Sequence, residues 1–383
     1  MTGSPSEISE LLEIARSIAL EAGELIKRRR AEGVTVALTK SSPQDVVTFA
    51  DKESEDLIRA RLAELRPADG FLGEESDATL GSSGITWVVD PIDGTVNYLY
   101  DIPAYAVSIA AVRSPEGAAD AVPDASSWTA LVGCVINPVV GEIFFAAAGQ
   151  GAFVAPLTAF AADGSFAEGR ADAARRLAVN IDVELPQALV GTGFAYSAEL
   201  RVKQGAFITG LVGQVRDIRR AGSAALDLCS VAAGRLDAYA ERGLNAWDHA
   251  AGALIAREAG AVVSGLDGEA ESTVLTFAAN PVLAAELGPI VFGLHRDAGL
   301  PVMDSTTHIV PLMVGDPVRA KKISDILLAE YGVYVQPINF PTVPRGTERL
   351  RFTPGPAHDE AMMRELTSAL AEIWDRLELR KAA

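Results

Sequence analysis

Cysteine, histidine and aromatic residues are scarce in this chain of 383 residues. The two cysteines, Cys134 and Cys229, lie far apart in apolar surroundings, without the CxxC spacing of a redox or zinc motif. We therefore expect two reduced thiols in the core of a cytoplasmic protein. The four histidines form no cluster, which argues against a histidine-ligated zinc site.

Basic residues and long apolar runs are also in short supply. Lys and Arg number 33 against 51 Asp and Glu, so the net charge is −18, which repels nucleic acids and anionic membranes. Glycine and proline break the uncharged run 143–162 into strand-length pieces, and three glutamates interrupt the apolar pattern of the first fifteen residues. The sequence thus predicts neither a membrane span nor a secretory signal peptide.

The apolar content of the chain supports a packed core, and the distribution of charge divides the chain into two parts. Apolar residues make up 49% of the chain. Residues 1–290 carry 22 basic and 39 acidic side chains (22 − 39 = −17), whereas residues 291–383 carry 11 and 12 (11 − 12 = −1). Four of the five methionines also lie in the second part. We predict two modules, 1–290 and 291–383, joined around 288–296.

Helix and strand patterns alternate in the first module. Ser4 and Pro5 are typical of a helix N-terminus, and the basic triplet 28–30 suits the end of that helix. The other expected elements are strands at 45–50, 85–90, 105–112, 130–137 and 142–147, and helices at 51–66, 198–210, 223–234 and 247–259. Antiparallel strand pairs next to helices predict a layered α/β arrangement with large mixed sheets.

Acidic side chains interrupt three otherwise apolar segments at expected strand ends or helix starts. The segments are Gly73-Glu74-Glu75, residues 87–95 (WVVDPIDGT) and Ala246-Trp247-Asp248. Burying a carboxylate in such surroundings is unfavourable without a counter-charge, and no Lys or Arg lies between Arg66 and Arg113. A metal ion is the natural counter-charge, and an oxygen-only ligand set favours Mg²⁺ or Mn²⁺.

The proline between the two aspartates of 87–95 suggests how this segment works. Pro91 holds Asp90 extended, so we expect Asp90 to end the strand and Asp93 to begin the next element. The carbonyl of Ile92 is then exposed between them as a further oxygen ligand. The N–H groups of residues 94–95 open a turn or helix that can face an anion, so the sequence predicts a phosphate-ester site.

These segments resemble the signatures of the inositol monophosphatase family. The first signature reads D-P-I-D-G-T at 90–95 with an aromatic residue, Tyr98, after it, and the second reads W-D-H-A-A-G at 247–252. The resemblance extends from about residue 8 to 287 and includes the segments 40–45, 191–194 and 222–224. It implies a layered α-β-α-β-α sandwich of the inositol monophosphatase type.

The resemblance implies a ligand set for metal ions. Glu74, Asp90 and the Ile92 carbonyl would hold a first Mg²⁺, and Asp90, Asp93 and Asp248 a second, with Mn²⁺ as a possible substitute. A third, weaker metal would interact with Glu74 through water. These cations would activate the attacking water, neutralise the phosphate and stabilise the leaving alkoxide.

The resemblance also implies catalytic and substrate-binding residues. Thr95, hydrogen-bonded to Asp45, would orient the water that attacks phosphorus in line, with Glu74 as a further catalytic residue. The residues implied to bind substrate surround the metal ions: Asp93, Gly94, Thr95, Ala224, Glu241 and Asp248.

Simpler interpretations remain open for several of the polar residues. Three acidic residues fit solvated charges or helix caps better than ligands: Asp51, Glu75 and Asp77. His249 fits a residue that faces the surface of its own helix, and Lys40 an exposed loop. Glu241 could instead pair with Arg219 or Arg242, which would remove the substrate contact.

The function predicted for 1–290 is Mg²⁺-dependent hydrolysis of a small phosphorylated polyol. Glu241 and Ala224 favour myo-inositol monophosphate, while the basic stretch 216–220 could reach a second phosphate or a carboxylate. Histidinol phosphate, fructose 1,6-bisphosphate and adenosine 3′,5′-bisphosphate therefore stay open as substrates within the same family. The resemblance is compatible with a homodimer.

The segments 308–317 and 332–351 resemble the C-terminal end of 5-aminolevulinate synthase. The tail reads as a strand, a helix capped by Asp316 with Pro317 in its first turn, one or two strands and a last helix. An apolar face is expected on that last helix: Met362, Met363, Leu366, Leu370, Ile373, Trp374 and Leu377. The resemblance implies a small α/β segment like the C-terminal subdomain of a fold-type I pyridoxal-phosphate enzyme, in which Arg351 would bind the glycine carboxylate.

The large pyridoxal-phosphate domain of that family is missing from this sequence, and its Schiff-base lysine is missing with it. The lysines of the tail, Lys321, Lys322 and Lys381, lie on a helix face or near the chain end. We therefore predict no cofactor-binding residues and no synthase activity. The alternatives are a pyridoxal-phosphate transferase or its partner subunit, a module that recruits the phosphatase to a haem-pathway enzyme, and a passenger of gene fusion.

Overall fold

The structure is a computed structural model that describes residues 4–34, 36–39, 46–115, 125–295, 309–353, 360–377 and 379. The chain divides into two compact units, Met1–Phe292 and Gly293–Ala383. In the first unit the helices are α1 (Pro5–Glu32), α2 (Phe49–Leu65), α3 (Thr95–Tyr100), α4 (Ala198–Leu211), α5 (Ala224–Ala232), α6 (Ala246–Glu258) and α7 (Pro281–His295).

The strands of the first unit form two large sheets and a short pair. The seven-stranded sheet has the order β3 (Gly70–Gly73), β4 (Ile85–Asp93), β5 (Ala106–Arg113), β6 (Thr129–Asn137), β7 (Glu142–Ala147), β8 (Gly151–Pro156) and β9 (Arg175–Arg176). The five-stranded sheet has the order β11 (Asp217–Arg219), β10 (Leu189–Thr192), β12 (Ala238–Glu241), β14 (Thr276–Ala279) and β13 (Val262–Ser264). The pair is β1 (Val36–Thr39) with β2 (Val46–Thr48).

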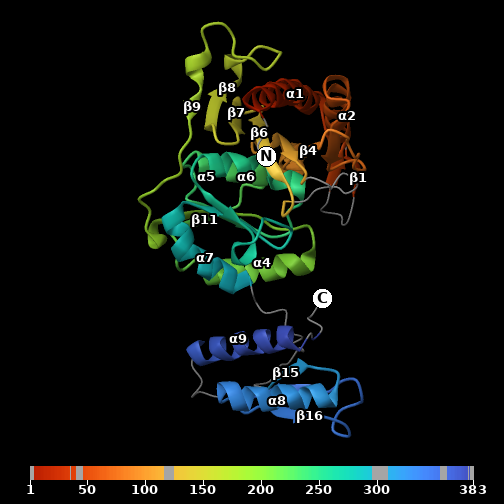
Figure 1. Cartoon of the computed structure of the whole chain (residues 1–383), viewed down its shortest axis with the longest axis vertical. Helices are drawn as coiled ribbons and strands as arrows, with labels where there is room; N and C mark the ends of the chain where they lie inside the picture. The colour runs from red at the N-terminus through yellow and green to blue at the C-terminus, as the bar shows by residue number, and fades with distance from the viewer. Residues whose placement is uncertain are drawn as a thin grey trace. The chain divides into compact units, whose positions relative to one another are not determined.

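Helices and sheets of the first unit stack in five layers (Figure 1). Helices α1 and α2 cover one face of the seven-stranded sheet, and α5 and α6 cover the other. The five-stranded sheet packs on the far side of α5 and α6, and α4 and α7 lie beyond it. Side chains alternate along β4 accordingly, because Trp87 and Val89 enter the core under α1 while Val88 enters the core around α5 and α6.

The expected elements are present within three residues of their predicted ends, with one informative difference. The strand that we expected to end at Asp90 continues to Asp93. Its pairing with β5 is regular up to Asp90 opposite Ser108, and the register shifts before Asp93 pairs with Ala106. Pro91 therefore places an irregularity inside the strand rather than ending it, because it donates no hydrogen bond.

The second unit contains β15 (Val310–Met313), α8 (Pro317–Tyr331), β16 (Gln336–Ile338), β17 (Arg349–Phe352) and α9 (Glu360–Arg376), and its antiparallel sheet has the order β15-β17-β16. Asp316 caps α8 as predicted, accepting the N–H of Arg319 at 2.7 Å. Of the predicted apolar face of α9, Leu370, Ile373 and Trp374 are buried. Met362 is 50% exposed, because it lies near the first turn of α9 and outside this core.

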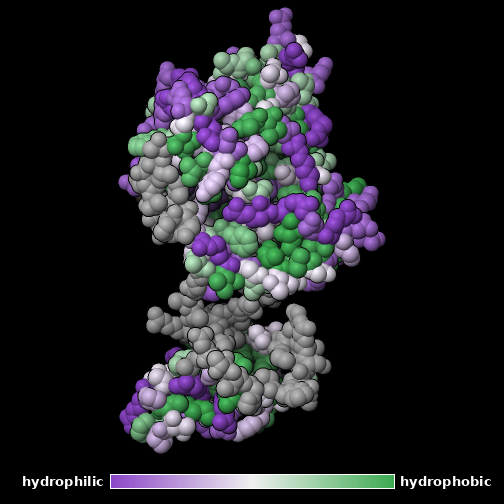
Figure 2. Space-filling view, turned by 180° about the vertical axis from the view of Figure 1, so that it is seen from behind, coloured by the Kyte–Doolittle hydropathy of each residue, from purple (hydrophilic) through white to green (hydrophobic). Residues whose placement is uncertain are grey.

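No helix in the described part of the chain combines the length and apolar character that a membrane span requires. Hydrophilic side chains lie between smaller hydrophobic areas on the face of the first unit seen in Figure 2. Both cysteines are buried and free, as predicted for core thiols.

Candidate active site

Parallel pairing of β3 with β4 brings two of the acidic segments together. Gly73, the last residue of β3, pairs with Val89 of β4. The residues that come next in the two parallel strands, Glu74 and Asp90, therefore lie side by side at the same end of the sheet. The charge of Glu74 contributes to raising the pKa of both Asp90 and Asp248. The two strands thus deliver carboxylates from different parts of the chain to one place.

Two helix N-termini bring in the remaining partners. Asp93 Oδ2 accepts hydrogen bonds from the hydroxyl of Ser223, the N-cap of α5, at 2.6 Å and from the Ala225 N–H at 2.7 Å. Asp248 lies in the first turn of α6, where its Oδ2 accepts the N–H of Asn245 at 2.6 Å. Acidic groups in a first turn are stabilised by the free N–H groups there.

Asp90, Asp93 and Asp248 offer carboxylate oxygens that all lie within 4.8 Å of one another. Asp90 and Asp93 are 1% and 7% exposed. Burial raises the pKa of all three, to about 6 for Asp93, and repulsion from the neighbouring carboxylates adds to the shift at Asp90 and Asp248. A dry cluster of hard oxygen donors that repel one another fits a divalent cation such as Mg²⁺ or Mn²⁺.

The hydroxyl of Thr95, the first residue of α3, lies between Asp51 and Ile92. Its Oγ1 is 3.0 Å from Asp51 Oδ1 and 3.1 Å from the Ile92 carbonyl, and it can donate to either. Asp51 Oδ2 accepts the N–H and hydroxyl of Thr48, completing a capping box at the start of α2. Asp51 is fully buried, which raises its pKa to about 6.

The predicted partner of Thr95, Asp45, lies outside the described residues. The structure instead gives Asp51 as the carboxylate that contacts Thr95, a residue for which the sequence favoured a cap or a solvated charge. Asp51 is a cap, but it is not solvated. Its position seven residues before the apolar Ile58, on the same face of an amphipathic helix, was the signal available in the sequence.

Gly94 turns the chain sharply between β4 and α3. Its φ is +95°, in the left-handed region, and a Cβ there would lie 2.9 Å from the Ala104 carbonyl and 3.1 Å from that of Gly222. The side-chain amide of Asn97 donates to Ala104 at 2.7 Å and to Ala221 at 2.8 Å, holding the same loops together. This contact brings the start of α5, with the predicted substrate residue Ala224, next to the turn.

Glu241 ends β12 with its side chain against Gly193, where any larger residue would overlap with the carboxylate. Its Oε2 accepts the hydroxyl of Tyr239 at 2.5 Å. Burial raises the pKa of Glu241 to about 7, with Asp93 adding to the shift while Tyr239 and Arg220 oppose it. Of the two arginines considered as partners, Arg219 is paired with Asp217 at 2.6 Å.

The remaining polar residues divide between core and surface. We expected His249 on the helix surface, but it is only 2% exposed because α6 is buried on this side. The centroid of its ring lies 6.4 Å from that of the Trp128 ring. Burial lowers its pKa to about 4, so it is neutral at physiological pH. Asp77 is exposed and Glu75 half-buried, and Lys40 lies outside the described residues.

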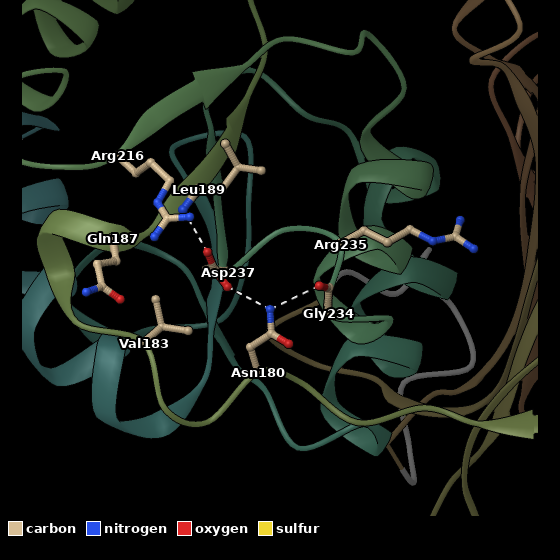
Figure 3. Close-up of a pocket in the computed structure, with 8 residues that line it drawn as sticks. All are labelled: Asn180, Val183, Gln187, Leu189, Arg216, Gly234, Arg235 and Asp237. Carbon is tan, nitrogen blue, oxygen red and sulfur yellow. Dashed lines mark hydrogen bonds between the residues drawn. The ribbon is translucent and has the colours of Figure 1, made fainter.

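A separate cavity of about 310 Å³ lies at the beginning of β12, whereas Glu241 lies at its end (Figure 3). Asp237 is one of its lining residues and accepts hydrogen bonds from Asn180 at 2.8 Å and from the Leu189 N–H at 2.7 Å. Arg216 lines this cavity, and the side chain of Arg235 points away from it, to Glu142. The first arginine of the basic stretch 216–220 therefore lies at the opposite end of β12 from Glu241.

Comparison with known families assigns each unit to a different one. Residues 7–291 match the model of the Inositol monophosphatase family, and residues 283–370 match that of Aminotransferase class I and II. The tail thus has the fold of the C-terminal region of the aminotransferase class, in agreement with the resemblance found in its sequence. The matched ranges meet within α7.

Curated relatives and solved structures agree with the first match. Inositol-1-monophosphatase SuhB of Mycobacterium tuberculosis is 42% identical over 320 residues, covering 79% of this chain and 100% of the relative. The solved structure of Mycobacterium tuberculosis SuhB has a TM-score of 0.58 at 41% identity, covering 75% of this chain and 97% of that one. The extragenic suppressor protein suhB of Bartonella henselae has a TM-score of 0.60 at 32% identity, covering 73% and 96%.

Proposed function

The chain belongs to the inositol monophosphatase family, and from that premise we propose that it is a Mg²⁺-dependent phosphatase whose preferred substrate is a myo-inositol monophosphate. The observation that carries this proposal is the cluster of Asp90, Asp93 and Asp248, with oxygens within 4.8 Å of one another, in which two residues are buried and Asp248 is half-buried. Relatives named as inositol-1-monophosphatases support the substrate class.

The proposed metal ligands are the three aspartates together with Glu74 and the Ile92 carbonyl. When bound, divalent cations would supply a nucleophilic water at neutral pH and would offset the charge of the phosphate and the leaving alkoxide. The protein's contribution is to hold the ligands in place. Asp93 is held by Ser223 and Ala225, and Asp248 by Asn245, so one oxygen of each carboxylate is fixed in place.

Thr95 and Asp51 form the proposed proton-handling pair. The Thr95 hydroxyl proton points to Asp51 Oδ1 or to the Ile92 carbonyl, so a lone pair of Oγ1 can accept a hydrogen bond from the attacking water. An ionised Asp51 favours this orientation. The adjacent N–H groups of Gly94 and Thr95 are the proposed contacts for the phosphate oxygens.

Glu241 is the proposed contact for a substrate hydroxyl. Tyr239 occupies one carboxylate oxygen, and Oε1 is left to accept a hydrogen bond from a polyol. Arg220 acts electrostatically on Glu241, so its charge would also attract a second anionic group of a substrate. The next best candidates are therefore the two bisphosphates, fructose 1,6-bisphosphate and adenosine 3′,5′-bisphosphate. Histidinol phosphate is the remaining alternative.

Colorimetric phosphate release by the metal-stripped chain tests the proposal across these four esters, with and without Mg²⁺ or Mn²⁺. We expect the highest kcat/KM on the inositol ester, strict dependence on a divalent cation, and a loss of about 100-fold or more in Asp93→Asn. Asp217→Asn, which changes an exposed aspartate paired with Arg219, is the matched control. A higher kcat/KM on histidinol phosphate would overturn the substrate, and undiminished activity without divalent cations would overturn the mechanism.

For the chain as a whole we propose a phosphatase domain over residues 1–290 and an aminotransferase-like segment over 291–383 without pyridoxal-phosphate chemistry. Lys321 lies on the exposed side of α8, where it pairs with Asp325 at 2.7 Å. Such a lysine is a surface charge rather than a Schiff-base former.

A further inference from the structure

One face of α2 carries three charged residues at intervals of four, Asp51, Glu55 and Arg59. Asp51 contacts Thr95, as described above. Glu55 is 2% exposed and reaches the segment that follows β3. Because Glu74 is the first residue of that segment, α2 contacts two parts of the candidate metal site at once.

The Glu55 carboxylate touches residues on both sides of Glu74. Its Oε2 accepts the N–H of Glu75 at 2.8 Å, and its Oε1 accepts the hydroxyl of Ser76. On the other side it packs so closely against Gly73 that a methyl group there would overlap with it. The backbone from Gly73 to Ser76 is thereby fixed around Glu74.

Arg59 anchors the next residues of the same segment. Its guanidinium donates to Ser76 Oγ at 2.6 Å, to the Asp77 carbonyl at 2.9 Å and to Thr79 Oγ1 at 2.7 Å, and it lies 4.1 Å over the Phe71 ring. Arg59 also lowers the pKa of Glu55 against the larger effect of burial. Arg59 and Glu55 thus contact the same hydroxyl, that of Ser76, and attract each other electrostatically.

We propose that Glu55 is a positioning residue that holds Glu74 at the cation site and thereby sets the affinity of the site for divalent cations. This inference rests on the proposed function, in which Glu74 is a metal ligand. Glu74 needs this restraint because the charges of Asp90 and Asp248 repel it before a cation binds. A carboxylate in that situation turns towards solvent unless its backbone is restrained.

The test uses the full chain, freed of metal, and two substitutions of Glu55. Glu55→Met keeps the shape and removes both contacts. Glu55→Gln keeps both, because its amide oxygen accepts the Glu75 N–H and its NH₂ donates to Ser76 Oγ. Calorimetric titration with Mn²⁺ should give a dissociation constant raised about tenfold or more in Glu55→Met and nearly unchanged in Glu55→Gln. The Mg²⁺ concentration for half-maximal phosphate release should rise in parallel, with KM at saturating Mg²⁺ unchanged.

Glu53→Met is the matched control, because Glu53 lies on the same helix but pairs with Arg29 at 2.6 Å, away from the segment. Its Mn²⁺ affinity should equal that of the wild type. A folded Glu55→Met that binds Mn²⁺ with wild-type affinity overturns the proposal. A Glu55→Gln that binds Mn²⁺ as weakly as Glu55→Met also overturns it, because the loss would then come from the charge and not from the two contacts. If Glu55→Met does not fold, Ser76→Ala tests the proposal instead. Weaker Mn²⁺ binding by Ser76→Ala supports the proposal, and wild-type Mn²⁺ binding contradicts it.

The Mn²⁺ titration requires no substrate, so it separates this proposal from the proposed function. A wild type that binds Mn²⁺ but releases no phosphate refutes the proposed function and leaves the comparison of Glu55 variants decisive. A wild type that binds neither Mn²⁺ nor Mg²⁺ overturns both.

Discussion

Single carboxylates in this protein acquire their properties from burial beside other carboxylates. Asp90, Asp93 and Asp248 each have a raised pKa, because the folded chain places them in a dry site where the ionised form is penalised. In the absence of a cation, a proton is the alternative neutralising partner. The same residues therefore link folding stability to both pH and metal.

The first prediction concerns that linkage. Burial raises the pKa of Asp93 to about 6, whereas an unfolded chain keeps it near 3.9, so the folded state binds the proton more tightly. The metal-free protein should therefore become more stable as pH falls from about 7, and the gain should reach about 1.4 kcal/mol for each unit of pKa difference once the pH is below about 4. With saturating Mg²⁺ the trend should reverse, because protons then displace the cation. Thermal unfolding with and without Mg²⁺ measures both trends, and identical pH profiles would contradict this account.

The second prediction distinguishes Asp51 from Asp45. Asp51→Asn should lower kcat about 100-fold, because it weakens the acceptor that orients the Thr95 hydroxyl, and should cost about 1 kcal/mol through the capping box of α2. Since burial raises the pKa of Asp51 to about 6, the wild-type kcat should also fall below that pH. Asp45→Asn is the matched comparison, and a larger loss of kcat there than in Asp51→Asn would restore the pairing expected from the sequence.

Among the helices, α6 shows how one signature serves both chemistry and packing. Asp248 in its first turn belongs to the cation cluster, whereas the small residues that follow allow close approach. Ala251 lies against Gly133 of β6, where an added Cβ would be 2.8 Å from the Ala251 carbonyl oxygen, and Gly252 lies against Leu228 of α5. The depth at which α6 sits between the two sheets, and so the position of Asp248, depends on these contacts.

The turn between β4 and α3 leads to the third prediction. Gly94→Ala should destabilise the protein by about 1–3 kcal/mol, because φ is +95° and the new Cβ meets the Ala104 and Gly222 carbonyls. Activity should fall as well, since Thr95 follows directly. Gly84→Ala is the control for backbone strain alone, because its φ is +78° and nothing lies within 4 Å of an added Cβ. Thermal unfolding and kcat of the two variants give the comparison, and equal behaviour would refute the role of the close contacts.

At the scale of the molecule, every candidate site residue that the structure describes lies in the first unit, Met1–Phe292. They come from both large sheets and from helices α2, α3, α5 and α6, so no single part of that unit makes the site. The aminotransferase-like unit contributes none of them.

The fourth prediction is that the second unit is dispensable for phosphatase activity. A chain that ends at His295 should keep kcat and KM within about twofold of the full-length values, because it retains all of α7. A chain that ends at Leu287 should unfold at a lower temperature, since it loses the last two turns of α7 and with them the buried Val291, whose burial is worth about 1.5–3 kcal/mol. A His295 chain without activity would show that the second unit supports the site.

Local pattern in the sequence determined much of this protein. Alternation of apolar residues identified the strands of the large sheet, and capping residues such as Ser4 and Asp316 marked helix starts, because both signals depend on neighbours within a few positions. The shift in charge near residue 290 predicted two modules, 1–290 and 291–383. The acidic residues in apolar segments also predicted that Asp90, Asp93 and Asp248 bind cations together, and oxygens of the three lie within 4.8 Å of one another.

Only the tertiary structure decided which residues meet across long separations in the chain. The contact of Asp51 with Thr95 spans 44 positions and that of Ser223 with Asp93 spans 130. Whether a polar residue such as Glu55 or His249 is solvated or buried also depended on what packs over its helix. Burial and long-range contact are properties of several elements together, so no local pattern in any one of them contains this information.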